Sequence, residues 1–286
     1  MHPTPRQPDF YVRCAGARVM PGVRRRKLPE KENAMNEHEQ ILAVIRAKNG
    51  SPIPLDPRKT ALIVVDMQRY FTQPSFPFTE VFNRLSPGAA SGYLKRVRHV
   101  VIPSIQKLLT CFRALGSPIV FTAVGTEVGQ GRDLPWWLRS FDELGLATLG
   151  SRIWPTVDDP SWQIDEAILP QAGEPVLSKF SAGAFATTGL EQRLRNQGIE
   201  AVVVTGVSSD VCVSTTAREA ADRDFRTIVV SDGCTTLSEQ MHQASLDTFN
   251  IAFGWVRTAD EVVALLERPA GTEPARSADA SKPSRG

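Results

Sequence analysis

Short apolar runs alternate with amphipathic stretches along most of the chain. The runs are rich in β-branched residues and lack polar alternation, which is typical of strands covered on both faces. These runs lie at Ala61–Val65, Pro118–Ala123, Pro175–Leu177, Ala201–Thr205, Thr227–Val230 and Ala252–Val256. Apolar residues at helical spacing lie between or after them, at Val100–Leu115, Thr188–Gln197, Val211–Arg223, Gln240–Asn250 and Ala259–Leu266. Repeated alternation of strand and helix predicts a parallel sheet with helices on both sides.

This alternation occupies residues 51–268, which we expect to form one α/β domain. Residues 1–50 are predicted to be a largely disordered N-terminal extension, since the first 34 are rich in Pro and Arg and lack periodicity. A short helix is expected within this extension, over Glu37 to Lys48. Residues 269–286 are rich in Pro, Ser and Ala and are predicted to be a disordered tail.

Composition and charge narrow the classes of function. A hydrophobic fraction of 42% supplies enough apolar side chains for a full core, and we expect neither a membrane span nor a secretory signal. The formal net charge is +2, but basic residues gather in residues 1–34, so the remaining chain is mildly acidic. We therefore expect no nucleic-acid partner. The four cysteines lack CxxC pairing, which favours reduced thiols in a cytoplasmic protein.

Residues with chemical potential follow three of the predicted strands, where open parallel sheets bind their ligands. Asp66 ends the first run and could be a reactive carboxylate or the N-cap of the next helix. Lys179 follows Pro175–Leu177, although most lysines are solvated surface charges. Cys212 lies after Gly206, in the first turn of a predicted helix whose dipole would favour the thiolate. The alternative for Cys212 is a small buried hydrophobic residue.

Histidines are poorly placed to activate a thiol. His2, His38 and His99 lie away from the predicted strand ends, and His242 lies inside a predicted helix, where a structural role is expected. A reactive Cys212 would therefore need a carboxylate, a cation and the helix dipole. The chain also has no cluster of His, Cys and Asp at metal-ligand spacing, so we expect no metal and no cofactor.

Three segments resemble the signature motifs of isochorismatase-like cysteine hydrolases. They are Ala61–Gln68, Leu177–Phe185 and Val204–Val213, in the family's order. The resemblance spans roughly residues 58–267. It implies a three-layer α/β/α fold with a six-stranded parallel sheet, in a homo-oligomer (a dimer or a tetramer).

The resemblance also implies a catalytic site. The family's Asp–Lys–Cys triad falls on Asp66, Lys179 and Cys212. A cis peptide is implied between Val207 and Ser208, and the N–H groups of Ser208 and Cys212 would form the oxyanion hole.

Branches of the family differ in their chemistry. True isochorismatases lack the cysteine, and nicotinamidases usually carry a metal-binding Asp-x-His segment where this chain has Ala123–Arg132. The segments Val211–Ala220 and Phe249–Val256 look more like amidohydrolases of carbamoyl or ureido compounds. The resemblance therefore predicts hydrolysis of a C–N amide or ureido bond of a small molecule through a thioester. The alternatives are a nicotinamide-, maleamate- or biuret-like amide as substrate, or a non-catalytic oligomeric family member.

Several residues are candidate substrate contacts: Gln68, Phe71, Trp136, Trp137 and Phe185. By resemblance, Phe71 and Phe185 line the pocket. The two tryptophans belong to the insertion Leu134–Phe141, which could cover the pocket or pack against another subunit. Arg132 and Arg139 could bind a substrate carboxylate, although surface arginines are usually solvated.

Overall fold

The computed structural model describes residues 36–49, 53 and 55–268. These residues fall into two units, one that ends at Gln40 and one that begins at Ile41. The described part of the first unit holds the start of helix α1 (Glu37–Asn49), which occupies the segment where a short helix is predicted. The backbone N–H of Glu39 donates to Asn36 Oδ1 at 2.8 Å, which caps this helix. The disorder predicted for residues 1–34 and 269–286 lies outside the described residues.

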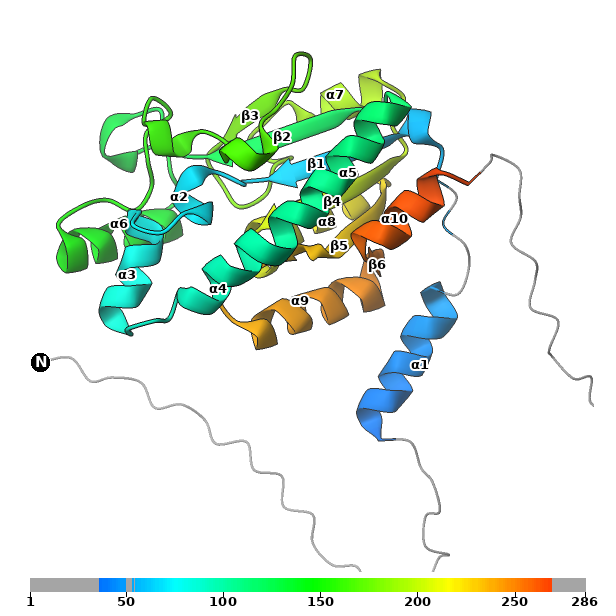
Figure 1. Ribbon diagram of the computed structural model, residues 1–286, viewed down its shortest axis with the longest axis horizontal. Helices are drawn as coiled ribbons and strands as arrows, with labels where there is room; N and C mark the ends of the chain where they lie inside the picture. The colour runs from blue at the N-terminus through cyan, green and yellow to red at the C-terminus, as the bar shows by residue number, and fades with distance from the viewer. Residues whose placement is uncertain (1–35, 50–52, 54, 269–286) are drawn as a thin grey trace, which may run out of the picture. The chain divides into compact units, whose positions relative to one another are not determined.

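The second unit is built on one six-stranded sheet in which every pair of neighbouring strands is parallel. The strand order is β3-β2-β1-β4-β5-β6 (Figure 1). The strands are β1 (Thr60–Val65), β2 (Ile119–Val124), β3 (Val176–Lys179), β4 (Ala201–Val207), β5 (Arg226–Thr235) and β6 (Trp255–Arg257). The predicted three-layer α/β/α fold with a six-stranded parallel sheet is confirmed.

Two apolar cores, one on each face of the sheet, explain why the strands read as unbroken apolar runs. In β1, Leu62 and Val64 belong to one core, whereas Ala61 and Ile63 belong to the other. All four side chains are completely buried. Burial of each larger aliphatic side chain contributes roughly 1.5–3 kcal/mol, so both faces of the sheet stabilise the fold.

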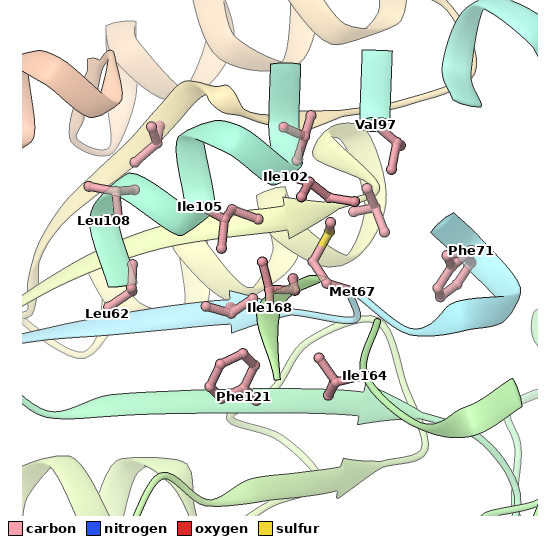
Figure 2. Close-up of a cluster of buried hydrophobic side chains, with 14 of the residues drawn as sticks. Leu62, Met67, Phe71, Val97, Ile102, Ile105, Leu108, Phe121, Ile164 and Ile168 are labelled. Atoms are coloured by element: carbon pink, nitrogen blue, oxygen red, sulfur yellow. The ribbon is translucent and has the colours of Figure 1, made fainter. Parts of the chain in front are cut away.

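Helices cover both faces. One face carries α4 (Ser91–Arg96), the π-helical turn Val97–Val101, α5 (Ile102–Leu115) and α10 (Ala259–Leu266). In Figure 2, Ile105 and Leu108 of α5 point toward the sheet, where Leu62 and Phe121 lie. The other face carries α7 (Leu190–Asn196), α8 (Ser214–Asp222) and α9 (Glu239–Ala252).

Further helices lie around the carboxyl ends of the strands, and periodicity alone did not predict them. They are α2 (Arg69–Thr72), α3 (Pro77–Leu85) and α6 (Trp136–Leu149). The 3-10 turns Gly129–Gly131, Pro160–Trp162 and Glu166–Ile168 lie between β2 and β3, whereas the 3-10 turn Pro57–Lys59 directly precedes β1. Among the described residues, no helix is both long and apolar enough to cross a membrane.

The boundaries of β5 and β6 differ most from the prediction. The last strand was expected at Ala252–Val256, but α9 continues to Ala252 and β6 begins only at Trp255. The N–H groups of Phe253 and Gly254 both bond to Phe249 O, which closes the end of the helix. Strand β5 continues past Val230 to Thr235, because its pairing with β4 resumes after an irregularity.

Candidate active site

Asp66, Lys179 and Cys212 meet at the carboxyl edge of the sheet. Asp66 directly follows β1, Lys179 is the last residue of β3, and Cys212 lies in a turn after β4. Lys179 Nζ lies 2.8 Å from Asp66 Oδ2 and 3.5 Å from Cys212 Sγ. One ammonium group therefore links the carboxylate to the sulfur.

The Asp66 carboxylate is held in one orientation. Its backbone has a left-handed φ of 52°, which non-glycine residues seldom adopt. Its N–H donates to Thr122 O at 3.0 Å, and its Oδ1 accepts a hydrogen bond of 2.8 Å from the Thr122 hydroxyl. Thr122 was not predicted as a site residue. Thr122 lies beside Asp66 because the parallel pairing of β1 and β2 puts Val65 opposite Thr122.

Lys179 is completely buried, yet its ammonium group is fully engaged. Besides Asp66 and Cys212, Nζ donates to the carbonyl oxygens of Ser181 at 2.6 Å and Ala182 at 3.0 Å. Burial by itself lowers the pKa of this amine, but the Asp66 carboxylate, followed by the Cys212 sulfur, outweighs burial and raises the pKa above its ordinary value. Lys179 is therefore a permanent cation at neutral pH.

The turn that carries Cys212 depends on a close backbone crossing. Gly206 has a φ of 113°, and a Cβ added there would lie 1.9 Å from the carbonyl oxygen of Val65. Only glycine fits this approach. The peptide bond between Val207 and Ser208 is cis, and a π-helical turn, Ser209–Val213, then precedes α8. The strand, the glycine and the turn bring the sulfur to the edge of the sheet.

The resting protonation state of Cys212 differs from the sequence-based expectation. The helix dipole was expected to favour the thiolate. Instead, burial raises the pKa of the thiol to about 12, with Lys179 lowering it and Asp66 raising it further. The residue lies in the π-helical turn before α8, and its exposed fraction is 7%. Desolvation therefore dominates, and at neutral pH the sulfur keeps its proton until a base removes it.

A cavity of about 330 Å³ opens at Cys212. Most of its lining is aromatic or aliphatic, and Cys212 is one of the lining residues. The lining residues are Phe71, Phe78, Phe82, Val124, Trp137, Leu138, Phe141, Trp154, Ser181, Ser208, Asp210, Val211, Cys212, Thr236, Leu237 and Met241. Phe71 and Trp137 are the predicted contacts that the structure brings to this cavity. Sequence reasoning missed Phe78 and Phe82, although they recur at helical spacing in α3.

The remaining predicted contacts lie elsewhere. The Gln68 amide is completely buried and bridges the backbone, donating to Val124 O and Trp162 O and accepting from Val124 N–H. This bonding gives it a structural role. The Trp136 side chain is 73% exposed and does not line the cavity. Phe185 packs against Phe225 in the core on the other face. Sequence adjacency to a motif did not specify these side-chain directions.

A polar network supports the turn that carries Cys212. His242 Nδ1 lies 2.9 Å from Ser209 Oγ, and its Nε2 lies 3.1 Å from a nitrogen of the Arg96 guanidinium. The Ser245 hydroxyl donates to Ser209 O at 2.9 Å. Burial, followed by the Arg96 charge, lowers the pKa of His242, so its neutral form holds the turn. The structural role expected for His242 matches this placement.

No group of three or more His, Cys, Asp or Glu side chains within residues 36–49, 53 and 55–268 is arranged to hold a metal ion. The predicted oxyanion-hole residues Ser208 and Cys212 both line the cavity.

Comparison with known proteins places this arrangement in a family. Residues 60–261, which include Asp66, Lys179 and Cys212, match the model of the isochorismatase domain. The chain belongs to the isochorismatase family. The resemblance drawn from the three motifs is confirmed.

Named family members include amidohydrolases. The chain is 29% identical over 233 residues to ureidoacrylate amidohydrolase RutB of Methylobacterium radiotolerans, covering 74% of this chain and 81% of the relative. It is 30% identical over 212 residues to N-carbamoylsarcosine amidase of an Arthrobacter species, covering 73% and 72% of the two chains. The crystal structure of a cysteine hydrolase from Pseudomonas syringae pv. phaseolicola superposes with a TM-score of 0.61 at 25% identity, covering 76% of this chain and 96% of that one.

Proposed function

We propose that the protein is a cysteine-dependent hydrolase that cleaves a C–N amide or ureido bond of a small molecule. The observation that carries the proposal is the contact of one buried ammonium, Lys179, with both Asp66 and Cys212 at the edge of a substrate-sized cavity. A nucleophile, a base and a cation are then within reach of one carbonyl group.

Acylation begins with a proton transfer. The Asp66 carboxylate takes the thiol proton as the Cys212 sulfur adds to the substrate carbonyl carbon, and the C=O electron pair moves onto oxygen. As the tetrahedral oxyanion collapses, the C–N bond breaks. Asp66 returns its proton to the departing nitrogen, and a thioester remains on Cys212. A base is required because the thiol is protonated at neutral pH.

Hydrolysis of the thioester reuses the same groups. Asp66 takes a proton from water as the water oxygen attacks the thioester carbonyl. The C–S bond then breaks, the proton passes from Asp66 to the sulfur, and the acid product leaves. Throughout the cycle, Lys179 stabilises the thiolate and keeps the carboxylate oriented. The N–H groups of Ser208 and Cys212 would receive the oxyanion, a type of contact that strongly lowers the barrier for acyl transfer.

Ureido and carbamoyl compounds are the substrate class that the relatives favour. The names of the two amidohydrolases refer to a ureido and a carbamoyl compound, and this agrees with the likeness of the segments Val211–Ala220 and Phe249–Val256. We extend the reaction type, the cleavage of a C–N bond beside a carbonyl group, to this chain.

Acetylation by para-nitrophenyl acetate tests the nucleophile without knowledge of the natural substrate. The wild type should release para-nitrophenol, and intact mass measurement after rapid acid quenching should find one acetyl group, mapped to Cys212. Cys212→Ala should show neither. The matched control is Cys111→Ala, which removes a thiol of α5 away from the cavity and should be acetylated like the wild type. Wild-type protein that neither releases para-nitrophenol faster than Cys212→Ala nor carries a trapped acetyl group would support the alternative, a non-catalytic family member.

Two further expectations accompany the proposal. Cys111, Cys212 and Cys234 are all free thiols, which supports work in a reducing compartment such as the cytoplasm. A homo-oligomer, dimer or tetramer, is proposed from the family resemblance, and light scattering after size-exclusion chromatography measures it.

A further inference from the structure

The walls of the active-site cavity form a connected set of aromatic rings. Phe71 and Phe78 lie edge to face with their centroids 4.7 Å apart, and Phe78 lies 6.4 Å from Trp154. Phe141 of α6 approaches Trp154 at 6.2 Å. Such contacts fix the rings relative to one another, so the cavity is preformed as an apolar, aromatic-lined space.

One charged side chain interrupts this wall. Asp210 lies two residues before Cys212 in the same turn and lines the cavity. Its Oδ1 is buried and has no hydrogen-bond partner among the residues that the structure describes. A buried acceptor without a donor is unfavourable, and an N–H group of a bound ligand would relieve this cost.

The cavity offers little to a carboxylate. Of the lining side chains in the part of the chain that the structure describes, Asp210 is the charged one, and it would repel an anion. The Lys179 ammonium is engaged with Asp66, Ser181 and Ala182. The two arginines considered as carboxylate ligands are not lining residues, and Arg139 donates to the backbone oxygen of Leu134.

We infer that the substrate is an amide or ureide with an aromatic or branched apolar body, without a carboxylate, that presents an N–H donor to Asp210. This inference rests on the proposed function and narrows its substrate class. Ureidoacrylate and N-carbamoylsarcosine, the compounds in the relatives' names, are both carboxylates. The aromatic wall and Asp210 would therefore give this chain a substrate specificity different from that of these two relatives.

Three matched ureides test the inference: benzylurea, its para-carboxy derivative and its para-aminomethyl derivative. Calorimetry on the Cys212→Ala protein measures their affinity without turnover. Benzylurea and the protonated amine should each bind at least about tenfold more tightly than the carboxylate, a typical effect of one charge-assisted or repulsive contact. If the amine binds more tightly than benzylurea, the ligand group that donates to Asp210 is preferably a cation. If benzylurea binds more tightly, a neutral N–H group is preferred. Equal or tighter binding of the carboxylate, or no binding of the other two, would overturn the inference.

The role of Asp210 is tested in the same background. Asp210→Asn should shift the ratio of affinities toward the carboxylate by about tenfold. The control Asp222→Asn removes the same charge from an exposed position of α8 and should leave the ratio unchanged. An unchanged ratio in Asp210→Asn would remove Asp210 from the site. Acetylation of Cys212 by para-nitrophenyl acetate reports on the proposed function separately, so the two can fail independently.

Discussion

The Thr122 hydroxyl donates a hydrogen bond of 2.8 Å to Asp66 Oδ1, and both side chains are completely buried. Strand pairing places them side by side, since Val65 is in register with Thr122. The neighbouring strand thus fixes one oxygen of the carboxylate, and Lys179 binds the other. This leaves the proposed base with a defined orientation toward the sulfur.

Thr122→Val replaces the hydroxyl with a methyl group of similar shape. The buried Asp66 oxygen would lose its donor, which costs roughly 1–3 kcal/mol of stability, and the rate of Cys212 acetylation should fall about tenfold as the base loses its orientation. Denaturant unfolding and acetylation kinetics measure these two effects. Thr122→Ser keeps the hydroxyl and should retain most of the acetylation rate. An equal loss of rate in both variants would mean that the packing of Thr122, not its hydrogen bond, supports the reaction.

Gly206→Ala adds a single methyl group and is expected to destabilise the fold strongly. The new Cβ would overlap the carbonyl oxygen of Val65 at 1.9 Å, with φ at 113°. Strain and overlap together should lower the free energy of unfolding by about 3 kcal/mol or more. Gly92→Ala in α4 is the control, because a Cβ there has no atom of the described residues within 4 Å. Thermal unfolding of both variants makes the comparison, and a normal Tm for Gly206→Ala would contradict the close crossing.

Local sequence predicted the sheet and the positions of the triad but not the wall of the cavity. Strands β1, β2 and β4 could be identified because both of their faces are buried, as the complete burial of Leu62 and Ile63 shows for β1. The side-chain directions of Gln68 and Phe185 depend instead on contacts with Trp162 and Phe225, far along the chain. The pKa of Cys212 was misjudged for the same reason, because burial is a property of the tertiary structure.

The rate at which iodoacetamide alkylates the Cys212 thiol should keep rising with pH and should reach no plateau near neutral pH. Burial places its pKa at about 12, so the thiolate fraction and the rate of alkylation by iodoacetamide should both rise with pH up to the limit of stability. Peptide mapping follows each thiol. Cys234 has a similarly raised pKa but is completely buried, so it should label more slowly. A plateau below about pH 8 would mean that the resting sulfur is a thiolate.

Stability should decrease in mildly acidic solution because of His242. Burial and the Arg96 charge lower its folded-state pKa, whereas Glu239 and Asp210 oppose the shift. Below about pH 6.5, the unfolded chain therefore binds a proton that the folded protein does not, and stability falls as the pH drops toward the lowered value. Chemical denaturation across this range should show a smaller decrease in His242→Asn. An identical decrease in both proteins would assign the effect to other groups.

Trp136 and Trp137 are neighbours in sequence with opposite surroundings, which makes them a matched pair. Trp137 lines the cavity, whereas the Trp136 side chain is 73% exposed. Trp137→Ala removes part of the aromatic wall and should weaken the binding of benzylurea to the Cys212→Ala protein by about tenfold or more. Trp136→Ala should change that affinity by less than about twofold, because an exposed side chain away from the site contributes little. Calorimetry on the Cys212→Ala protein that also carries Trp136→Ala or Trp137→Ala gives both affinities. If Trp136→Ala weakened binding as much as Trp137→Ala, the insertion would reach the ligand through a different conformation or through a second subunit.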